Sequence, residues 1–311
     1  MLRNITNRLF QGLIVLFVLG TLTFFLVHAL PYGPFQDEKA VPEHVMERLK
    51  QLHGYDKPLL TQYGLRLKNI VQGDLGESIK VMEGRKISDI LRQAFPVSLT
   101  LGLIAMCIAV LIGIPAGIFA AIRKNTPVDY IIMAVALLGI CLPNFVIGPL
   151  LAEFFGARLS WFPVSGWNPR DPAGMFLPAL TLGLVSAAYL SRLTRAGMLE
   201  VLNQDFIRTA RAKGQKGYII ILRHALRGGL IPSIAFLGPA FAGTISGSVV
   251  VETIFQVPGM GRLFIKAIET SDETLIMGPV LLYGTLIVTA NFVTDLLQIW
   301  LNPRLRAAKA S

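Results

Sequence analysis

The chain has 311 residues, of which 53% are apolar and only 15% are charged, and its formal net charge at pH 7 is +10. Soluble globular domains have about 25% charged residues, so this composition excludes an ordinary soluble domain and indicates a membrane protein. The excess positive charge suits anionic lipid headgroups or an acidic protein partner. It does not indicate nucleic acid, because the basic residues lie between apolar runs and do not alternate with aromatic residues.

Six apolar runs are long enough to cross a bilayer, which takes about 20 residues in a helix. The first lies within residues 1–30, and we interpret it as an uncleaved helix because it exceeds the usual signal-peptide core of about 7–15 residues and has no A-x-A-like cleavage site. The sequence therefore predicts an all-α, polytopic membrane protein with six transmembrane helices. The other five form a transmembrane domain at residues 96–302, with spans at about 96–122, 130–152, 175–197, 230–251 and 275–301.

The short segments between the spans predict the orientation, because Lys and Arg are retained on the cytoplasmic side. With the N-terminus inside, the cytoplasmic segments hold fifteen Lys and Arg, and the short outer loops hold four. The reversed topology would place the fifteen outside. We therefore predict that both termini are cytoplasmic, including a short tail at residues 303–311.

Residues 31–95 form the one sizeable polar region, with ten Lys and Arg and nine Asp and Glu. Short amphipathic helices are expected at 45–52 and 57–71, and turn residues occur at 56–58 and 73–76. We expect a small extracytoplasmic (periplasmic) segment that rests on the membrane domain, with a loosely ordered loop as the alternative.

The chain contains none of the motifs that mark common catalytic or nucleotide-binding sites. There is no G-x-x-x-x-G-K-[ST], H-E-x-x-H, G-x-S-x-G or G-x-G-x-x-G, and the four histidines and two cysteines are scattered. We therefore predict that the chain is not an enzyme and holds no catalytic residue, metal ion or cofactor. If the chain performs energised transport, the energy therefore comes from another chain.

Three acidic residues lie within or beside the spans: Glu153, Glu252 and Asp295. Such groups cost a few kcal/mol at the bilayer centre on insertion scales, so they normally face protein or water. A proton relay would use groups of this kind. Because all three lie near span ends, hydrogen bonding at helix ends or subunit contact is the other interpretation.

Small residues suggest where helices approach each other and where a polar path runs. The segments 113–117 and 243–247 are both G-x-x-x-G, which permits close helix contact. Hydroxyl groups lie on the fifth span, so this span is the candidate lining of a translocation path, at Thr244, Ser246 and Ser248. Simple helix packing is the alternative.

An irregular backbone is expected after the fifth span, at Pro258, Gly259 and Gly261. Irregular backbone at membrane depth is tolerated only where protein buries it or where it lines a cavity. This outer loop is therefore predicted to be a re-entrant turn near the outer gate, with a plain surface turn as the alternative.

The basic segment at residues 198–229 contains the start and stop residues expected of two short helices. Asn203 can cap the first helix and Gly214 can end it in a left-handed conformation. Phe206 and Ala210 are expected to form an apolar ridge flanked by guanidinium groups, which suits insertion into an acidic cleft. We predict a cytoplasmic docking surface for a separate soluble protein. The alternative is a basic loop that only fixes topology.

This segment resembles the cytoplasmic signature of ABC-transporter permeases of the oligopeptide/dipeptide importer family. The chain has D-F-I-R-T-A-R-A-K-G at 205–214 and H-A-L-R at 224–227, similar to the pattern of the peptide branch. It departs from the general importer signature at Arg208 and Thr209, where Glu and Ala would stand. The resemblance covers essentially the whole chain and is closest to the B-type permease subunits.

The resemblance implies the type I ABC importer permease fold in the inner (plasma) membrane of a bacterial cell. It also implies a heterodimer with a second homologous permease subunit, two ABC ATPase subunits that bind ATP and magnesium, and an extracytoplasmic peptide-binding protein. The coupling helix that enters the ATPase would comprise Asp205, Phe206, Ile207, Arg208, Thr209, Ala210, Arg211, Ala212, Lys213 and Gly214.

On this basis we expect the permease subunit of an oligopeptide importer. Uptake of dipeptides, nickel or glutathione is the alternative within the family. A proton-coupled secondary carrier and a scaffold that only anchors ATPases are the alternatives from other classes.

Overall fold

The computed structural model describes residues 2–29, 47, 55–168 and 171–301. These residues are almost entirely helical and contain no β-strand, which confirms the predicted all-α fold. The only extended pairings among them are two isolated β-bridges, Glu77 with Lys86 and Asn168 with Asp171.

The helices alternate between long apolar rods and short connecting pieces. In chain order they are α1 (Leu2–His28), α3 (Leu59–Val71), α4 (Ile87–Ile122), α5 (Pro127–Cys141), α6 (Asn144–Leu151), the π-helix η1 (Ala152–Arg158), α7 (Ala173–Leu202), α8 (Asp205–Ala212), α9 (Gly217–Ile219), the π-helix η2 (Ile220–Ala225), α10 (Leu226–Gly229), α11 (Ile231–Ile254), α12 (Met260–Glu269) and α13 (Glu273–Leu301).

Five of these helices, α1, α4, α7, α11 and α13, are long and apolar enough to cross a membrane. The bent pair of α5 with α6 and η1 supplies a sixth if it is counted as one span. The predicted helix at 57–71 is present as α3. The tail at 303–311 and, apart from residue 47, the helix expected at 45–52 lie outside the described residues.

Helix α4 begins at Ile87, nine residues before the predicted start of its span. Asp89 and Arg92 made this stretch look like part of the polar segment. The structure shows an amphipathic turn instead, because Ile90 and Leu91 are buried while both charged residues are exposed. Because one face of this turn is apolar, the helix begins before the continuous apolar run that marks the span.

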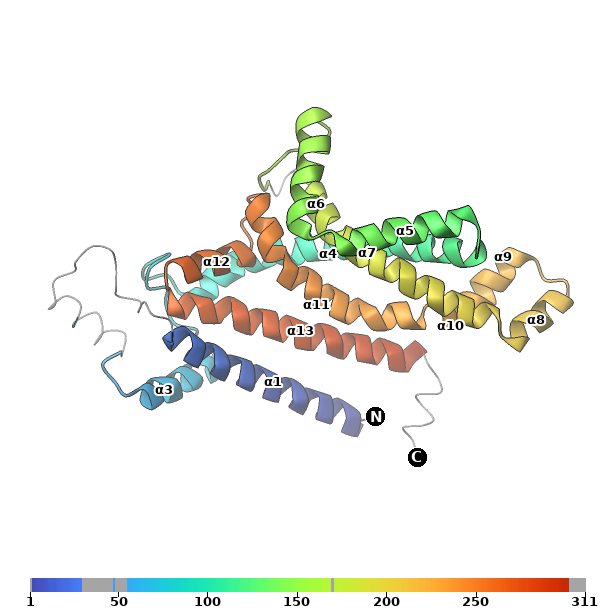
Figure 1. The fold of residues 1–311 in the computed structure, drawn as a ribbon. Coiled ribbons are helices and arrows are strands. Elements are labelled where there is room, and N and C mark those ends of the chain that lie inside the picture. The colour runs from blue at the N-terminus through green and yellow to red at the C-terminus, as the bar shows by residue number, and fades with distance from the viewer. Residues whose placement is uncertain (1, 30–46, 48–54, 169–170, 302–311) are drawn as a thin grey trace. The chain divides into compact units, whose positions relative to one another are not determined.

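The span predicted at residues 130–152 is broken in the structure. Helices α5 and α6 meet at an angle of 107°, a bend that Figure 1 shows clearly. Pro143 lacks an N–H group and disfavours helical backbone at the residue before it, and Leu142 is extended with φ −84° and ψ 121°. Length and hydropathy alone did not reveal this bend.

The described chain forms two compact units. The first comprises Met1–Arg8, Ser98–Val257 and Leu286–Ser311, and the second comprises Leu9–Val97 and Pro258–Thr285.

Helix α7 is the centre of the first unit. It packs against α5, α6, α10 and α11, as Figure 1 shows, and it is the most buried of the five long apolar helices. Small residues allow this, since a Cβ atom at Gly183 would lie 2.7 Å from the backbone oxygen of Ala105 on α4. Helices lacking bulk at the contact can bring their backbones together.

The two G-x-x-x-G segments differ in what they face. A Cβ atom at Gly113 would lie 2.5 Å from the Ala187 backbone oxygen, so the first segment brings α4 close to α7, as predicted. A Cβ atom at Gly243 would meet nothing within 4 Å. At that position the second segment is not used for packing within the described chain.

Gly113→Ala is therefore expected to lower the free energy of unfolding by about 1–3 kcal/mol, because the clash is with fixed backbone. Gly243→Ala is the matched control on α11 and is expected to be neutral or slightly stabilising, since Ala favours a helix over Gly by about 1 kcal/mol. Thermal unfolding of the purified chain in detergent measures both. Equal midpoints for the two variants would contradict the packing described here.

A carboxylate that accepts five hydrogen bonds organises the second unit. Asp272 is fully buried just before α13; Ser78 Oγ donates to its Oδ2 at 2.6 Å, and the N–H of Leu275 donates to its Oδ1 at 3.1 Å. Its Oδ2 also accepts the N–H groups of three consecutive residues, Ile79, Lys80 and Val81. This carboxylate fixes the polar segment to the start of α13.

The same hydrogen bonds govern the ionisation of Asp272. Burial acts to raise its pKa, but the hydrogen bonds from Ser78 and from the backbone outweigh burial, and the pKa lies below the ordinary value. The ionised form is therefore the one that the fold stabilises.

Candidate functional site

The segment predicted at 205–214 contains the helix α8 (Asp205–Ala212), which lies in the chain between the end of α7 and the π-helix η2. Gly214 follows it with φ 73°, which confirms the predicted left-handed helix end. The predicted cap is wrong: Gln204 is the N-cap residue, and Asn203 instead donates its side-chain amide to the backbone oxygen of Leu199 at 2.9 Å. The Asn203 side chain thus caps the end of α7 and not the start of α8.

One side of α8 belongs to the core of the first unit. Ile207 and Ala210 are buried in a cluster with Met198 of α7 and Ile220 of η2. The expected ridge of Phe206 and Ala210 is therefore not present, because Ala210 faces the chain's own interior.

The rest of the predicted coupling residues lie on the surface. Phe206 is 48% exposed although it is a large aromatic residue. The exposed set consists of Asp205, Phe206, Arg208, Thr209, Arg211, Ala212, Lys213 and Gly214. The exposed side of helix α8 thus presents one aromatic side chain among several basic ones. Ile207, on its other side, holds the helix against the core of the first unit.

The segment after α8 connects it to the transmembrane helices. Gln215 Oε1 and His224 Nε2 lie 2.9 Å apart, which ties the turn after α8 to η2. Farther along, α10 packs on α7, and a Cβ atom at Gly229 would lie 3.1 Å from the Met198 Cα. Packed side chains therefore connect α8, through η2 and α10, to α7 and α11.

An ion pair that the sequence did not reveal lies in the same unit. Arg195 on α7 donates through Nε to Asp129 Oδ1 at 2.6 Å and through Nη2 to Oδ2 at 2.7 Å. Asp129 is 1% exposed and also accepts the N–H of Asn125, which has φ 61°. This pair locks the turn between α4 and α5 onto α7. No local pattern could have found it, because the partners are 66 residues apart.

The candidate path residues of α11 do not share one environment. Thr244 is buried and lies 3.2 Å from Ser186 Oγ, and Ser248 is buried and donates to Glu252 at 2.9 Å. Only Ser246 is exposed. It belongs to a continuous exposed stripe of mostly small residues, at Pro239, Gly243, Ser246, Val250 and Thr253.

The acidic residues of the spans have partners within the chain. Glu252 is fully buried, and its Oε1 accepts hydrogen bonds from Ser98 at 2.6 Å and from Ser248 at 2.9 Å. Asp295 lies 3.2 Å from Arg8 Nε. Glu153 forms an exposed ion pair at 3.1 Å with Arg158 in the same π-helix.

The predicted outer loop is a short turn followed by a helix. Gln256 has φ 54°, and Gly259 is the N-cap residue of α12. Pro258 is exposed, whereas Gly261 is buried inside α12 and has regular helical backbone. The irregular stretch is therefore shorter than the sequence suggested.

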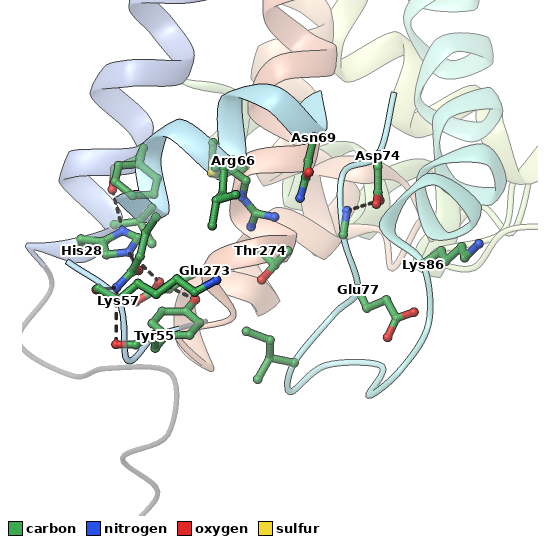
Figure 2. Close-up of a pocket in the computed structure, with 17 residues that line it drawn as sticks. His28, Tyr55, Lys57, Arg66, Asn69, Asp74, Glu77, Lys86, Glu273 and Thr274 are labelled. Carbon is green, nitrogen blue, oxygen red and sulfur yellow. Dashed lines mark hydrogen bonds and ion pairs between the residues drawn. The ribbon is translucent and has the colours of Figure 1, made fainter. Parts of the chain in front are cut away.

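The second unit contains a cavity of about 500 Å3 beneath α3, shown in Figure 2. Its lining carries three Lys and Arg side chains and three Asp and Glu side chains, together with His28 and with aromatic, aliphatic and amide side chains. The charged members are Lys57, Arg66, Lys86, Asp74, Glu77 and Glu273.

A hydrogen-bond network closes one end of this cavity. Tyr55 donates to Glu273 Oε2 at 2.8 Å, and His28 Nε2 lies 3.7 Å from the same oxygen. Nε2 of His28 also lies 3.2 Å from Gln62 Oε1, while its Nδ1 lies 2.9 Å from the backbone oxygen of Phe24. Burial, and then the Glu273 carboxylate, raise the pKa of Tyr55, so the phenol stays protonated and donates.

No group of three or more His, Cys, Asp and Glu side chains suited to a metal ion occurs among the described residues.

Sequence profiles of two transport families match the chain. The profile described as "Binding-protein-dependent transport system inner membrane component" matches residues 113–307. The corresponding N-terminal profile of such membrane components matches residues 1–102.

Similar curated proteins carry peptide-transport names. The chain is 41% identical to the oligopeptide transport system permease protein OppB of Haemophilus influenzae, covering 98% of this chain and 100% of that protein. It is 40% identical to OppB of Escherichia coli with the same coverage. It is also 40% identical to the dipeptide transport system permease protein DppB of Bacillus subtilis, covering 99% of each.

Solved structures of ABC transporters share the fold. The inward-facing MetNI methionine ABC transporter matches with a TM-score of 0.58 at 14% identity, covering 68% of this chain and 96% of that chain. A crystal structure of an amino acid ABC transporter with histidines matches with a TM-score of 0.51 at 17% identity, covering 68% and 94%. These likenesses establish the type I importer permease fold.

Proposed function

Because the chain belongs to the family of binding-protein-dependent transport system inner membrane components, in the branch of the B-type oligopeptide and dipeptide permeases, we propose that it is the transmembrane permease subunit of an ATP-driven peptide importer. The observation that carries this proposal is helix α8. It buries Ile207 within its own unit and leaves Phe206 and its basic neighbours on the surface.

Helix α8 is proposed to be the coupling helix, from Asp205 to Gly214. The side chains that it exposes support this proposal, since Phe and Arg are both enriched in protein interfaces. ATP and magnesium would be bound by two ATPase subunits on the cytoplasmic side. Closure of the ATPase pair would push α8, and its packing on η2 and α7 would carry the movement to the spans.

The remaining partners follow from the same assignment. A second homologous permease subunit would complete the translocation path, and an extracytoplasmic binding protein would deliver the peptide. The exposed stripe of α11 around Ser246 is the surface proposed to face the path or the second permease. Gly243 supports this, because nothing in the described chain packs against it.

Oligopeptides are the proposed substrates. Sequence identity alone hardly distinguishes an oligopeptide permease from a dipeptide permease, since the named relatives of the two kinds are 41% and 40% identical to this chain. Nickel and glutathione remain alternatives within the family. Both termini are proposed to be cytoplasmic, on the distribution of Lys and Arg.

A proton-coupled carrier remains the alternative from another class. It would need an essential acidic residue in a span and would work without ATPases. Loss of uptake by Glu252→Gln or Asp295→Asn in vesicles that lack ATP would support the carrier. In the structure Glu252 is bonded by Ser98 and Ser248, which favours a packing role for it.

Phe206→Asp is expected to leave the chain folded in the membrane and to abolish ATP-driven peptide uptake, because it places a charge where the partner would bury an aromatic ring. Arg211→Glu is expected to act in the same direction. Uptake by proteoliposomes that hold the co-purified complex, with ATPase activity followed in parallel, measures the loss of coupling. Normal uptake by Phe206→Asp would refute the coupling assignment.

The adjacent residue supplies the contrast. Ile207 is fully buried, so Ile207→Asp is expected to reduce the amount of folded chain and not merely the coupling. Purification of the tagged chain from its native membrane tests the assembly as a whole. Recovery of a second permease and two ATPases is expected, and recovery of the chain alone in an active state would contradict the proposal.

A further inference from the structure

The cavity beneath α3 in the second unit is not used by the coupling mechanism, yet it contains a base with spare hydrogen-bond donors. The Arg66 guanidinium has five N–H donors. Among the described residues its only hydrogen bond runs from Nη1 to the backbone oxygen of Leu75, at 3.3 Å. Figure 2 shows the Arg66 side chain reaching into the cavity, with Asn69 one turn along the same helix.

The Arg66 guanidinium lies against the turn at Gly76. Gly76 has φ 79°, a conformation that favours glycine, and a Cβ atom there would lie 2.9 Å from Arg66 Nη1, so a larger residue would displace the guanidinium. Burial lowers the pKa of Arg66, while Tyr55, Glu273 and Asp74 act in the opposite direction. A half-buried guanidinium with unused donors is suited to a carboxylate, which accepts two parallel hydrogen bonds.

The cavity is nevertheless not an anion site in general, because its charges balance. Lys57, Arg66 and Lys86 line it together with Asp74, Glu77 and Glu273. Glu273 is already engaged by Tyr55. Asp74 and Glu77 are both exposed, and Asp74 uses only its Oδ1 for the hydrogen bond from the N–H of Gly76. A ligand with one charge of each sign gains from lining groups of both signs, whereas a plain anion also meets the acids.

We propose that this cavity binds a small zwitterion of the amino-acid or short-peptide class, with its carboxylate on Arg66 and its ammonium group toward Asp74 and Glu77. A volume of about 500 Å3 lies in the usual range of small-molecule sites, about 300–1,000 Å3. That the zwitterion is a peptide rests on the proposed function. The charge arrangement of the cavity does not.

The probe is the dipeptide alanyl-alanine, compared with its N-acetyl form and its C-terminal amide. Binding is measured by calorimetry on the full chain in lipid nanodiscs, without ATP, ATPase or binding protein. Alanyl-alanine is expected to bind, and blocking either terminus is expected to weaken binding by at least about tenfold, the value of one charged hydrogen bond.

Arg66→Gln is expected to weaken binding of alanyl-alanine by at least about tenfold, because the amide has no charge. Arg85→Gln is the matched control: Arg85 is exposed on the same segment, does not line the cavity, and its substitution should leave binding unchanged. If Arg66→Gln does not fold, the three ligands on the wild-type chain decide the question alone.

Equal binding by wild type and Arg66→Gln would overturn the proposal, as would absence of binding to the wild type. Tight binding of N-acetyl-alanyl-alanine would also overturn it, since it would identify an anion site. The proposed transport function is tested by a separate measurement, ATP-driven peptide uptake, and can fail independently of binding. A chain that binds alanyl-alanine but supports no ATP-driven uptake would keep the cavity and refute the importer.

Discussion

Arg195→Met is expected to lower the free energy of unfolding by about 3–5 kcal/mol, the usual cost of leaving a buried charge without its partner. Asp129 is 1% exposed and receives both of its short side-chain hydrogen bonds from Arg195. Without Arg195 it keeps only the N–H of Asn125. The thermal unfolding midpoint of the purified chain in nanodiscs is expected to fall accordingly.

Two further variants separate the ion pair from a general effect of removing positive charge. Arg192→Met removes an exposed Arg from the same helix and is expected to change stability little. Asp129→Leu combined with Arg195→Met is expected to recover much of the loss, because a buried pair replaced by apolar residues is often neutral. A double variant as unstable as Arg195→Met alone would contradict this account.

Asp272→Ala is the second large effect expected, at about 3 kcal/mol or more, since it leaves four backbone N–H groups and the Ser78 hydroxyl without their acceptor. Asp74→Asn is the matched control. Asp74 is exposed and accepts one backbone hydrogen bond, from Gly76, so its loss should cost far less.

The effect of Asp272 depends on pH in a defined direction. Its folded pKa lies below the ordinary value of about 3.9, so the carboxylate contributes its full stability above about pH 4. This contribution is lost as the pH falls through the folded pKa. The difference in unfolding midpoint between wild type and Asp272→Asn should therefore be constant from pH 7 to about 5 and shrink below about 4. A difference that grows on acidification would contradict the assignment.

Local patterns in the sequence predicted the features that depend on neighbouring residues. The apolar runs predicted the spans, and Gly214 predicted the end of α8, because both are set by a few adjacent residues. The same local reasoning failed at Asn203, whose side chain donates to the backbone oxygen of Leu199 at the end of α7 and does not cap α8.

Features set by distant partners were not predictable in this way. Ser78 and Asp272 are 194 residues apart, and no periodicity relates them. The bend after α5 was hidden for another reason: its proline signal was present at Pro143, but hydropathy averaged over the span concealed it. The cavity was missed because residues from α1, α3 and the start of α13 line it together.

The division of the chain has a consequence for its synthesis. The second unit combines Leu9–Val97 with Pro258–Thr285, so its first part waits until roughly 190 more residues have been made. At about 5–20 residues per second, that delay is on the order of 10–40 s. During this time the main-chain donors at 79–81 have no Asp272 to accept them and bond to water instead, so the second unit closes only after residue 272 has been made.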